Sequence, residues 1–136
     1  MWSALHAFLF IRRHVVKTEL SPWTWHDCDE VLLYAMMAIL VEYVEREMPH
    51  GWTDWNNDDE SRKAKSEIDA IYAWWKSYPS REAEIRVATA KWHDASEAGE
   101  NDRALFDRLH GLEDKLYAET EEMMVRLVKV KDWIWE

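Results

Sequence analysis

Paired glutamates at two places in this sequence have the spacing of a metal-binding site. Glu42 and Glu45 lie three residues apart, and Glu119 and Glu122 repeat that spacing. Residues three apart share one face of an α-helix, and carboxylate oxygens suit the hard cations Mg²⁺ and Mn²⁺. Two such helices facing each other, with Asp27 nearby, would form the metal site of a metal-dependent nucleotide (pyro)phosphohydrolase. The opposing interpretation is a solvated acidic stripe, which 27 acidic residues readily produce.

Other groupings with catalytic potential are weaker. Two His-Asp dipeptides, at 26–27 and 93–94, have no recognisable further ligands for a metal-dependent phosphohydrolase. Cys28 is the only cysteine, and the aspartates on both sides of it oppose formation of a thiolate nucleophile. The sequence also contains no glycine-rich phosphate loop and no Gly-x-Ser-x-Gly motif. We therefore expect no catalytic residues unless the paired glutamates bind metal.

Tryptophan is the most unusual feature of the composition, with ten in 136 residues. Aromatic rings in loops and at helix ends anchor partners or stack on flat ligands. Acidic neighbours favour a protein partner or a cationic ligand. The alternative is that the rings seal the ends of a small helical bundle. The candidate binding residues are Trp25, Asp27, Asp29, Tyr34, Trp52, Trp55, Trp74, Trp133 and Trp135.

Composition and charge narrow the choice of partner. The formal net charge is −10, which argues against nucleic acid because a basic face would be needed. The apolar segment near the N-terminus is too short to span a bilayer, which argues against a membrane partner. A single cysteine excludes an intrachain disulfide and favours a reducing cytoplasm.

The sequence predicts one all-α domain over 1–136, a bundle of about five helices. Its three glycines and three prolines are too few for an all-β fold. Asp27 and Glu30 resemble a capping box, and Pro49 and Pro79 are expected to end helices. The expected elements are an N-terminal helix over 1–20, a central buried helix over 24–48, middle helices over 58–77 and 80–98, and a long C-terminal helix over 102–135.

The C-terminal helix carries the clearest periodic pattern in the chain. Its apolar positions follow one another at spacings of four and three: Leu105, Leu109, Leu112, Leu116, Thr120, Met123, Leu127, Val130 and Ile134. A helix of this length measures about 50 Å, whereas a compact domain of this size is roughly 35–40 Å across. The helix therefore either bends near Gly111 or is covered at one end by a second copy. We favour a homodimer.

Three segments carry a family resemblance: "WTWHDCDEVLLYAMMAILVEYVERE", "AWWKSYPSRE" and "LEDKLYAETEEMMVRLVKVKDWIWE". They resemble uncharacterised small acidic all-α proteins of large tailed bacteriophages. The resemblance implies a phage origin and expression in the host bacterial cytoplasm, and it implies no activity. The positions that it marks are Trp25, Asp27, Asp29, Glu45, Trp74, Trp75, Glu119, Glu121, Arg126 and Trp133.

These observations favour a phage-encoded accessory binding protein without catalysis. Its partner would be a host protein or a small signalling ligand, in host takeover or counter-defence. The first alternative is the metal-dependent nucleotide (pyro)phosphohydrolase with Mg²⁺ or Mn²⁺ bound by the paired glutamates. The second alternative is a virion or packaging component.

Overall fold

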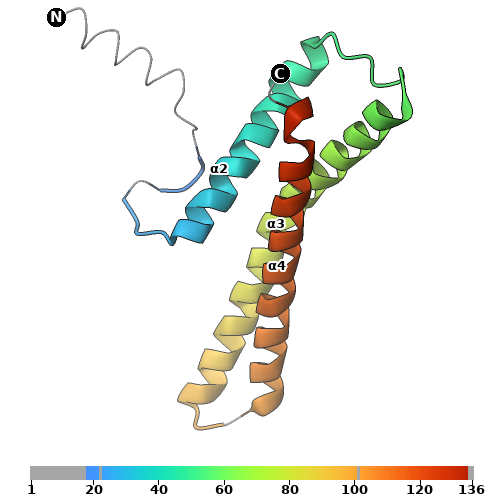
Figure 1. The fold of residues 1–136 in the computed structure, drawn as a ribbon. Coiled ribbons are helices and arrows are strands. Elements are labelled where there is room, and N and C mark those ends of the chain that lie inside the picture. The colour runs from blue at the N-terminus through green and yellow to red at the C-terminus, as the bar shows by residue number, and fades with distance from the viewer. Residues whose placement is uncertain (1–17, 22, 101, 135–136) are drawn as a thin grey trace, which may run out of the picture. The chain divides into compact units, whose positions relative to one another are not determined.

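The computed structural model describes residues 18–21, 23–100 and 102–134. These residues form three α-helices and no strand: α2 spans Cys28–Glu42, α3 spans Asp59–Glu97 and α4 spans Arg103–Val130 (Figure 1). The prediction of an all-α chain with a long C-terminal helix is confirmed. The helix predicted over 1–20 lies outside the described residues. None of the described helices is long and apolar enough to cross a lipid bilayer.

The chain divides into two compact units, Met1–Pro49 and His50–Glu136, where the sequence predicted one domain. The helical segment of the first unit is less regular than predicted. A π-helical turn at Tyr43–Glu47 and a 3-10 turn at Met48–His50 follow α2. Met48 keeps helical geometry, with φ −55° and ψ −41°, so the predicted stop before Pro49 is wrong. Pro49 is accommodated within the 3-10 turn.

One stripe of this segment is buried, as its apolar spacing predicts. Leu33, Met37 and Leu40 are at most 3% exposed, whereas Leu32 is 52% exposed, so the helix is not buried on all sides. Asp27 is the residue before the first turn, but its side chain makes no capping hydrogen bond. The predicted capping box is therefore wrong.

Helix α3 is continuous where the sequence predicted two helices. It runs for 39 residues through Pro79, the predicted boundary. Proline has no N–H, so the carbonyl of Trp75 loses its usual helical donor. The Ser77 hydroxyl donates to the neighbouring carbonyl of Trp74 at 2.7 Å. The prediction of separate helices over 58–77 and 80–98 is wrong, because contacts to α4 on both sides of Pro79 hold one helix together.

Capping residues set the ends of both long helices. The Asp58 carboxylate accepts a hydrogen bond from the Ser61 backbone N–H at 2.7 Å and so begins α3. Gly99 adopts a left-handed conformation, with φ +76°, just after α3 ends. The Asp102 carboxylate then accepts from the backbone N–H groups of Ala104 and Leu105 at 2.9 and 3.2 Å. These caps agree with the helix starts predicted at 58 and 102 and with the helix end predicted at 98.

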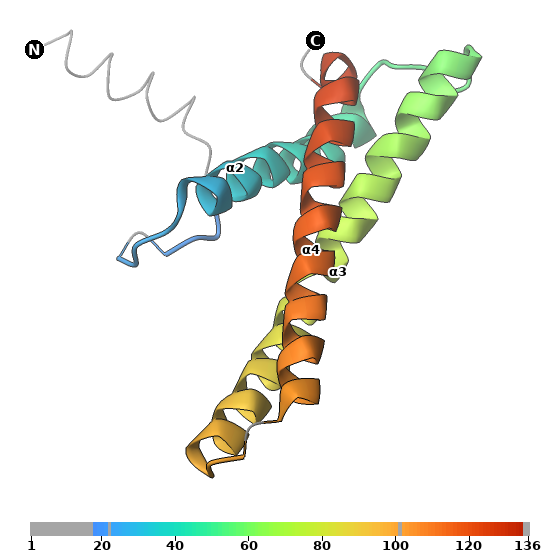
Figure 2. The ribbon, with the colours of Figure 1, turned by 60° about the horizontal axis from the view of Figure 1, so that its bottom comes forward.

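Helices α3 and α4 form an antiparallel hairpin within the second unit. In Figure 1 and Figure 2 the two helices come together near their middles and spread apart toward the green start of α3 and the red end of α4. The predicted stripe of α4 lies on its less exposed side: Leu109, Leu127 and Val130 are buried, and the other leucines of the stripe are half-buried. Gly111 lies within continuous α-helix, and a 3-10 turn at Lys131–Trp133 follows α4.

Candidate functional site

The segment before α2 exposes two indoles beside acidic side chains. Trp23 is 94% exposed and Trp25 is 82% exposed, and Asp27 and Asp29 are exposed as well. His26 fixes this segment: its ring nitrogens lie 2.9 Å from a Glu30 carboxylate oxygen and 3.0 Å from the Ser21 carbonyl oxygen. The hydrogen bond with Glu30 raises the pKa of His26. The exposed indoles therefore stand on an anchored turn.

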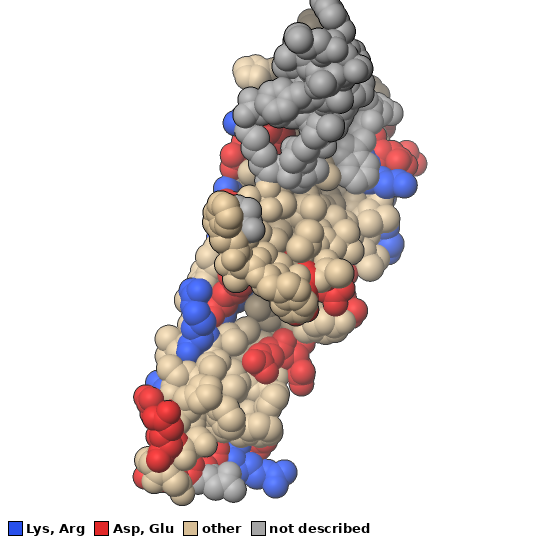
Figure 3. Space-filling view, turned by 90° about the vertical axis from the view of Figure 1, so that its left-hand side faces the viewer, with Lys and Arg blue, Asp and Glu red and all other residues tan. Residues whose placement is uncertain are grey.

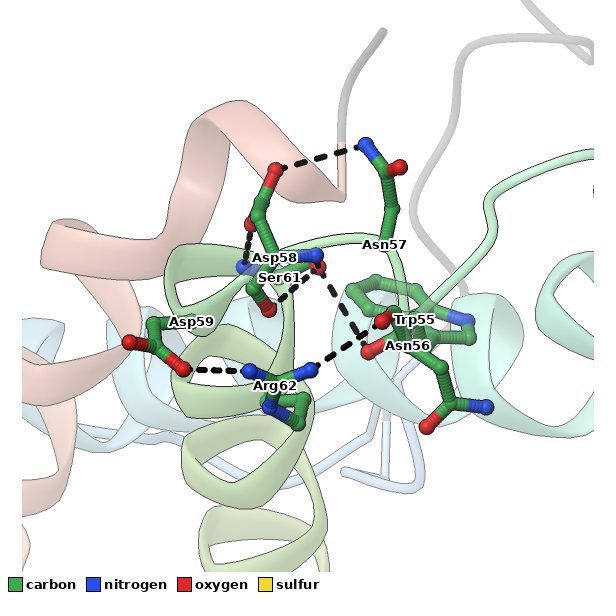
Figure 4. Close-up of polar contacts among 7 residues, drawn as sticks. All are labelled: Trp55, Asn56, Asn57, Asp58, Asp59, Ser61 and Arg62. Carbon is green, nitrogen blue, oxygen red and sulfur yellow. Dashed lines mark hydrogen bonds and ion pairs between the residues drawn. The ribbon is translucent and has the colours of Figure 1, made fainter.

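A second acidic segment, residues 51–58, presents a further indole. Trp52 is fully exposed, at 102% of its reference area. The loop behind it is fixed to the first turn of α3, where Arg62 donates to the Asn56 carbonyl oxygen at 3.0 Å and Ser61 bonds with Asp58 (Figure 4). Hydrogen bonds from Ser61 lower the pKa of Asp58. We call residues 23–29 and 51–58 the indole segments.

Not every predicted binding tryptophan is available to a partner. The rings of Trp55 and Trp133 lie 5.9 Å apart between centroids, and both are half-buried. They pack between the start of α3 and the end of α4, as the sealing interpretation predicts. Trp135 lies outside the described residues. Tyr34 is half-buried and has a contact of its own.

Trp74 is the clearest correction to the predicted binding residues. It is only 7% exposed, while its neighbour Trp75 is half-buried. The Trp74 indole N–H donates to Glu119 Oε2 of α4 at 3.2 Å. Arg81 donates to the same oxygen. We call these three residues the clamp.

The clamp joins α4 to α3 on both sides of Pro79. Trp74 precedes the proline and Arg81 follows it, so one carboxylate holds the two parts of α3 in line. The hydrogen bond from Arg81 is the main cause that lowers the pKa of Glu119, and the Trp74 hydrogen bond adds to it. Charged hydrogen bonds of this kind are stronger than neutral ones. The clamp offsets the helical hydrogen bond that Pro79 cannot make.

A second ion pair joins the same helices closer to the start of α3 and the end of α4. Arg126 Nε and Nη2 donate to the two carboxylate oxygens of Glu67 at 2.7 and 3.0 Å. This bidentate geometry lowers the pKa of Glu67 and raises that of Arg126. Residues 59 positions apart cannot be paired from spacing alone, so the sequence carried no signal for this contact.

The four glutamates proposed as metal ligands are otherwise engaged. Glu42 is 3.0 Å from Arg46, and Glu122 is 3.6 Å from Arg126. Glu119 belongs to the clamp, and Glu45 lies in the π-helical turn, where the regular i, i+3 geometry of an α-helix does not hold. Within the described ranges, no group of three or more His, Cys, Asp or Glu side chains is placed to hold a metal ion. Glu42, Glu119 and Glu122 act here as ion-pair partners.

Comparisons with protein-family models, with curated proteins and with solved structures return no match for this chain. The function must therefore be argued from the chemistry of its own surfaces. The strongest candidates are the indole segments, because Trp23, Trp25 and Trp52 are exposed and neighbouring residues of both segments are held by hydrogen bonds.

Proposed function

We propose that this chain is a phage-encoded accessory protein that binds a host protein in the bacterial cytoplasm through its indole segments, without catalysis. The observation that carries the proposal is the exposure of three tryptophans, Trp23, Trp25 and Trp52, at 94, 82 and 102%. Each indole offers about 150–250 Å² of apolar surface. Burying such a ring at the centre of an interface supplies much of the binding energy in known complexes.

The chemistry around the indoles indicates what kind of surface they bind. Asp27 and Asp29 lie in the first indole segment and Asp54 lies in the second. The chain as a whole has a net charge of −10. A lysine or arginine over an indole face gains from cation–π attraction, and nearby carboxylates reinforce it. The expected partner therefore presents basic side chains around an apolar recess. A small cationic signalling ligand would meet the same chemistry.

The test is a quantitative capture experiment from bacterial lysate. The immobilised full chain is compared with a variant that carries Trp23→Ser, Trp25→Ser and Trp52→Ser. The control carries Val87→Ser and Val128→Ser, which alter exposed apolar side chains outside the indole segments. We expect one host protein to be retained by the native chain and by the control, and lost from the indole variant. Added salt should weaken the retention, since the contact includes opposite charges.

A thermal-shift screen with nucleotides and cationic metabolites tests the small-ligand form of the proposal. Stabilisation of the native chain, absent from the indole variant, would support it. Equal capture of the same proteins by native chain and indole variant, with no ligand response, would overturn the assignment to these tryptophans. Recovery of the chain in purified phage particles would instead support a virion component.

A further inference from the structure

The end of the hairpin near the α3–α4 turn has a face with exposed aromatic side chains that its own two helices cover only in part. We call residues 82–97 of α3 and 103–118 of α4 the arm. Among the described residues of the arm, only Ala88 and Leu109 are buried. Phe106 is 43% exposed and Tyr117 is 61% exposed. Figure 3 shows uncharged surface over the lower half of its view, toward the turn, with acidic and basic side chains along its margins.

Matching rows of residues on the two helices make up this face. On α3 the row is Ile85, Thr89, Trp92 and Ser96, and on α4 it is Phe106, His110, Glu113 and Tyr117. Both rows have the spacing four, three, four that keeps residues on one side of a helix. The rings of Trp92 and Phe106 lie 6.1 Å apart between centroids, which places the two rows next to each other. Phe106 also contacts His110, with ring centroids 4.1 Å apart.

We propose that this face binds the same face of a second copy, so that two arms form an antiparallel four-helix bundle. Two helices alone bury one narrow seam, whereas four helices enclose a core. The two rows of each arm would line that core, with α4 beside the partner's α4 and α3 beside the partner's α3. The occupant is a second copy because the row on α4 is complementary to itself.

The complementarity follows from the positions of the residues about one point. A two-fold axis between residues 111 and 112 pairs positions that lie equally far on either side of it. Phe106 and the partner's Tyr117 are each about five residues from this point, which pairs two aromatic rings. His110 and the partner's Glu113 are equally placed, and they already form a contact of 3.3 Å within one chain. Arg103 falls within one residue of the position opposite the partner's Glu121.

The opposite side of α4 does not share this property. Around Gly111 the exposed margins differ in charge, with Asp107 and Asp114 on one margin and Arg108 and Lys115 on the other. In an antiparallel two-fold pair the same margin of each helix meets. Acidic side chains would then lie against acidic ones and basic against basic. The Phe106 face is therefore the one that accepts a second copy.

Disulfide trapping in full-length protein tests the register. In a background with Cys28→Ser, chains with Phe106→Cys are mixed with chains with Tyr117→Cys and oxidised gently. The two positions are about 16 Å apart along one helix, so no bond can form within a chain. We expect a cross-linked heterodimer to form in high yield. The control mixes Val125→Cys with Phe106→Cys, because Val125 is similarly exposed but lies about 12 Å beyond Tyr117 along α4, and little cross-linking is expected.

A charge exchange tests the same geometry in solution. Arg103→Glu and Glu121→Arg, each alone, place like charges opposite each other and should weaken dimerisation about tenfold by sedimentation. The double variant should restore it. Arg103 and Glu121 lie about 27 Å apart on one helix, so the rescue can arise only between chains. A native chain that stays monomeric over a roughly hundredfold range of concentration, or trapping no better than the Val125 control, would overturn the proposal.

Discussion

The two ends of the α3–α4 hairpin differ in how they are stabilised. We call residues 61–81 of α3 and 119–130 of α4 the base. In the base, Ile68, Ile71 and Leu127 are at most 3% exposed, and the clamp and the Glu67–Arg126 pair connect the helices. In the arm, the ion pairs Arg103–Asp107 and His110–Glu113 run along a single helix. One continuous leucine stripe passes through both ends, so the stripe alone does not decide how firmly each end is held.

This difference separates two roles within one hairpin. The base combines apolar burial with charged hydrogen bonds of defined geometry, which specify the register of the two helices. The arm offers half-buried apolar side chains that gain free energy only if another surface covers them. Regions with few buried contacts open more easily than the rest of a protein. The arm is thus suited to association and the base to stability.

The largest expected effect comes from removing buried volume in the base. Ile68→Ala leaves a cavity at a side chain that is 0% exposed and should lower the free energy of unfolding by about 3 kcal/mol. Leu112→Ala in the arm removes a half-buried side chain and should cost about 1 kcal/mol. Urea unfolding followed by circular dichroism measures both. Equal losses at the two positions would contradict the distinction between base and arm.

Lowering the pH should reduce the stability of the base of the hairpin, where Glu67 and Glu119 lie. The contribution of His26 to the stability of the first unit should not be reduced. The pKa values of Glu67 and Glu119 are lowered in the folded chain, so their contribution is complete above the ordinary glutamate pKa. It is lost as the pH falls through the lowered values. The pKa of His26 is raised, so its contribution is present below the ordinary histidine value and is lost as the pH rises through the raised one. Denaturation curves and histidine NMR titrations from pH 3 to 8 (roughly the range where carboxylates and histidine titrate) measure both.

Breaking the clamp should have a smaller effect. Glu119→Gln removes the charge that Arg81 and Trp74 share and should cost about 1–2 kcal/mol. The loss should be accompanied by faster amide exchange around Pro79, because the clamp holds α3 together there. Glu122→Gln is the matched control: its side chain is 64% exposed and 3.6 Å from Arg126, and it should cost less than about 0.5 kcal/mol. If the amides around Pro79 exchange as slowly in the Glu119→Gln variant as in the native chain, the clamp does not hold α3 together there.

The sequence predicted the helices better than the contacts between them. Apolar spacing identified the stripe from Leu105 to Ile134, and the helix starts predicted at 58 and 102 coincide with the Asp58 and Asp102 caps, because both signals act within a few residues. Local rules failed at Pro79, where the Glu119 contact from a distant helix outweighs the proline. They failed again at Trp74, since periodicity does not distinguish which of two adjacent indoles is buried. The prediction from the Glu42–Glu45 spacing failed for a similar reason: it assumes regular α-helical geometry, and Glu45 lies in a π-helical turn.

The smallest effects are expected at two glycines, Gly99 in the turn next to the arm and Gly111 within the arm. Gly111 lies in the interior of α4, and a Cβ added there meets no atom within 4 Å. Gly111→Ala should therefore stabilise the chain by about 0.5–1 kcal/mol, since alanine favours helix. Gly99 also has space around it, but its φ of +76° disfavours a side chain. Gly99→Ala should destabilise by about 1 kcal/mol. Thermal unfolding at equal protein concentration separates these opposite signs, and a gain at both positions would show that the turn does not hold Gly99 in its left-handed conformation.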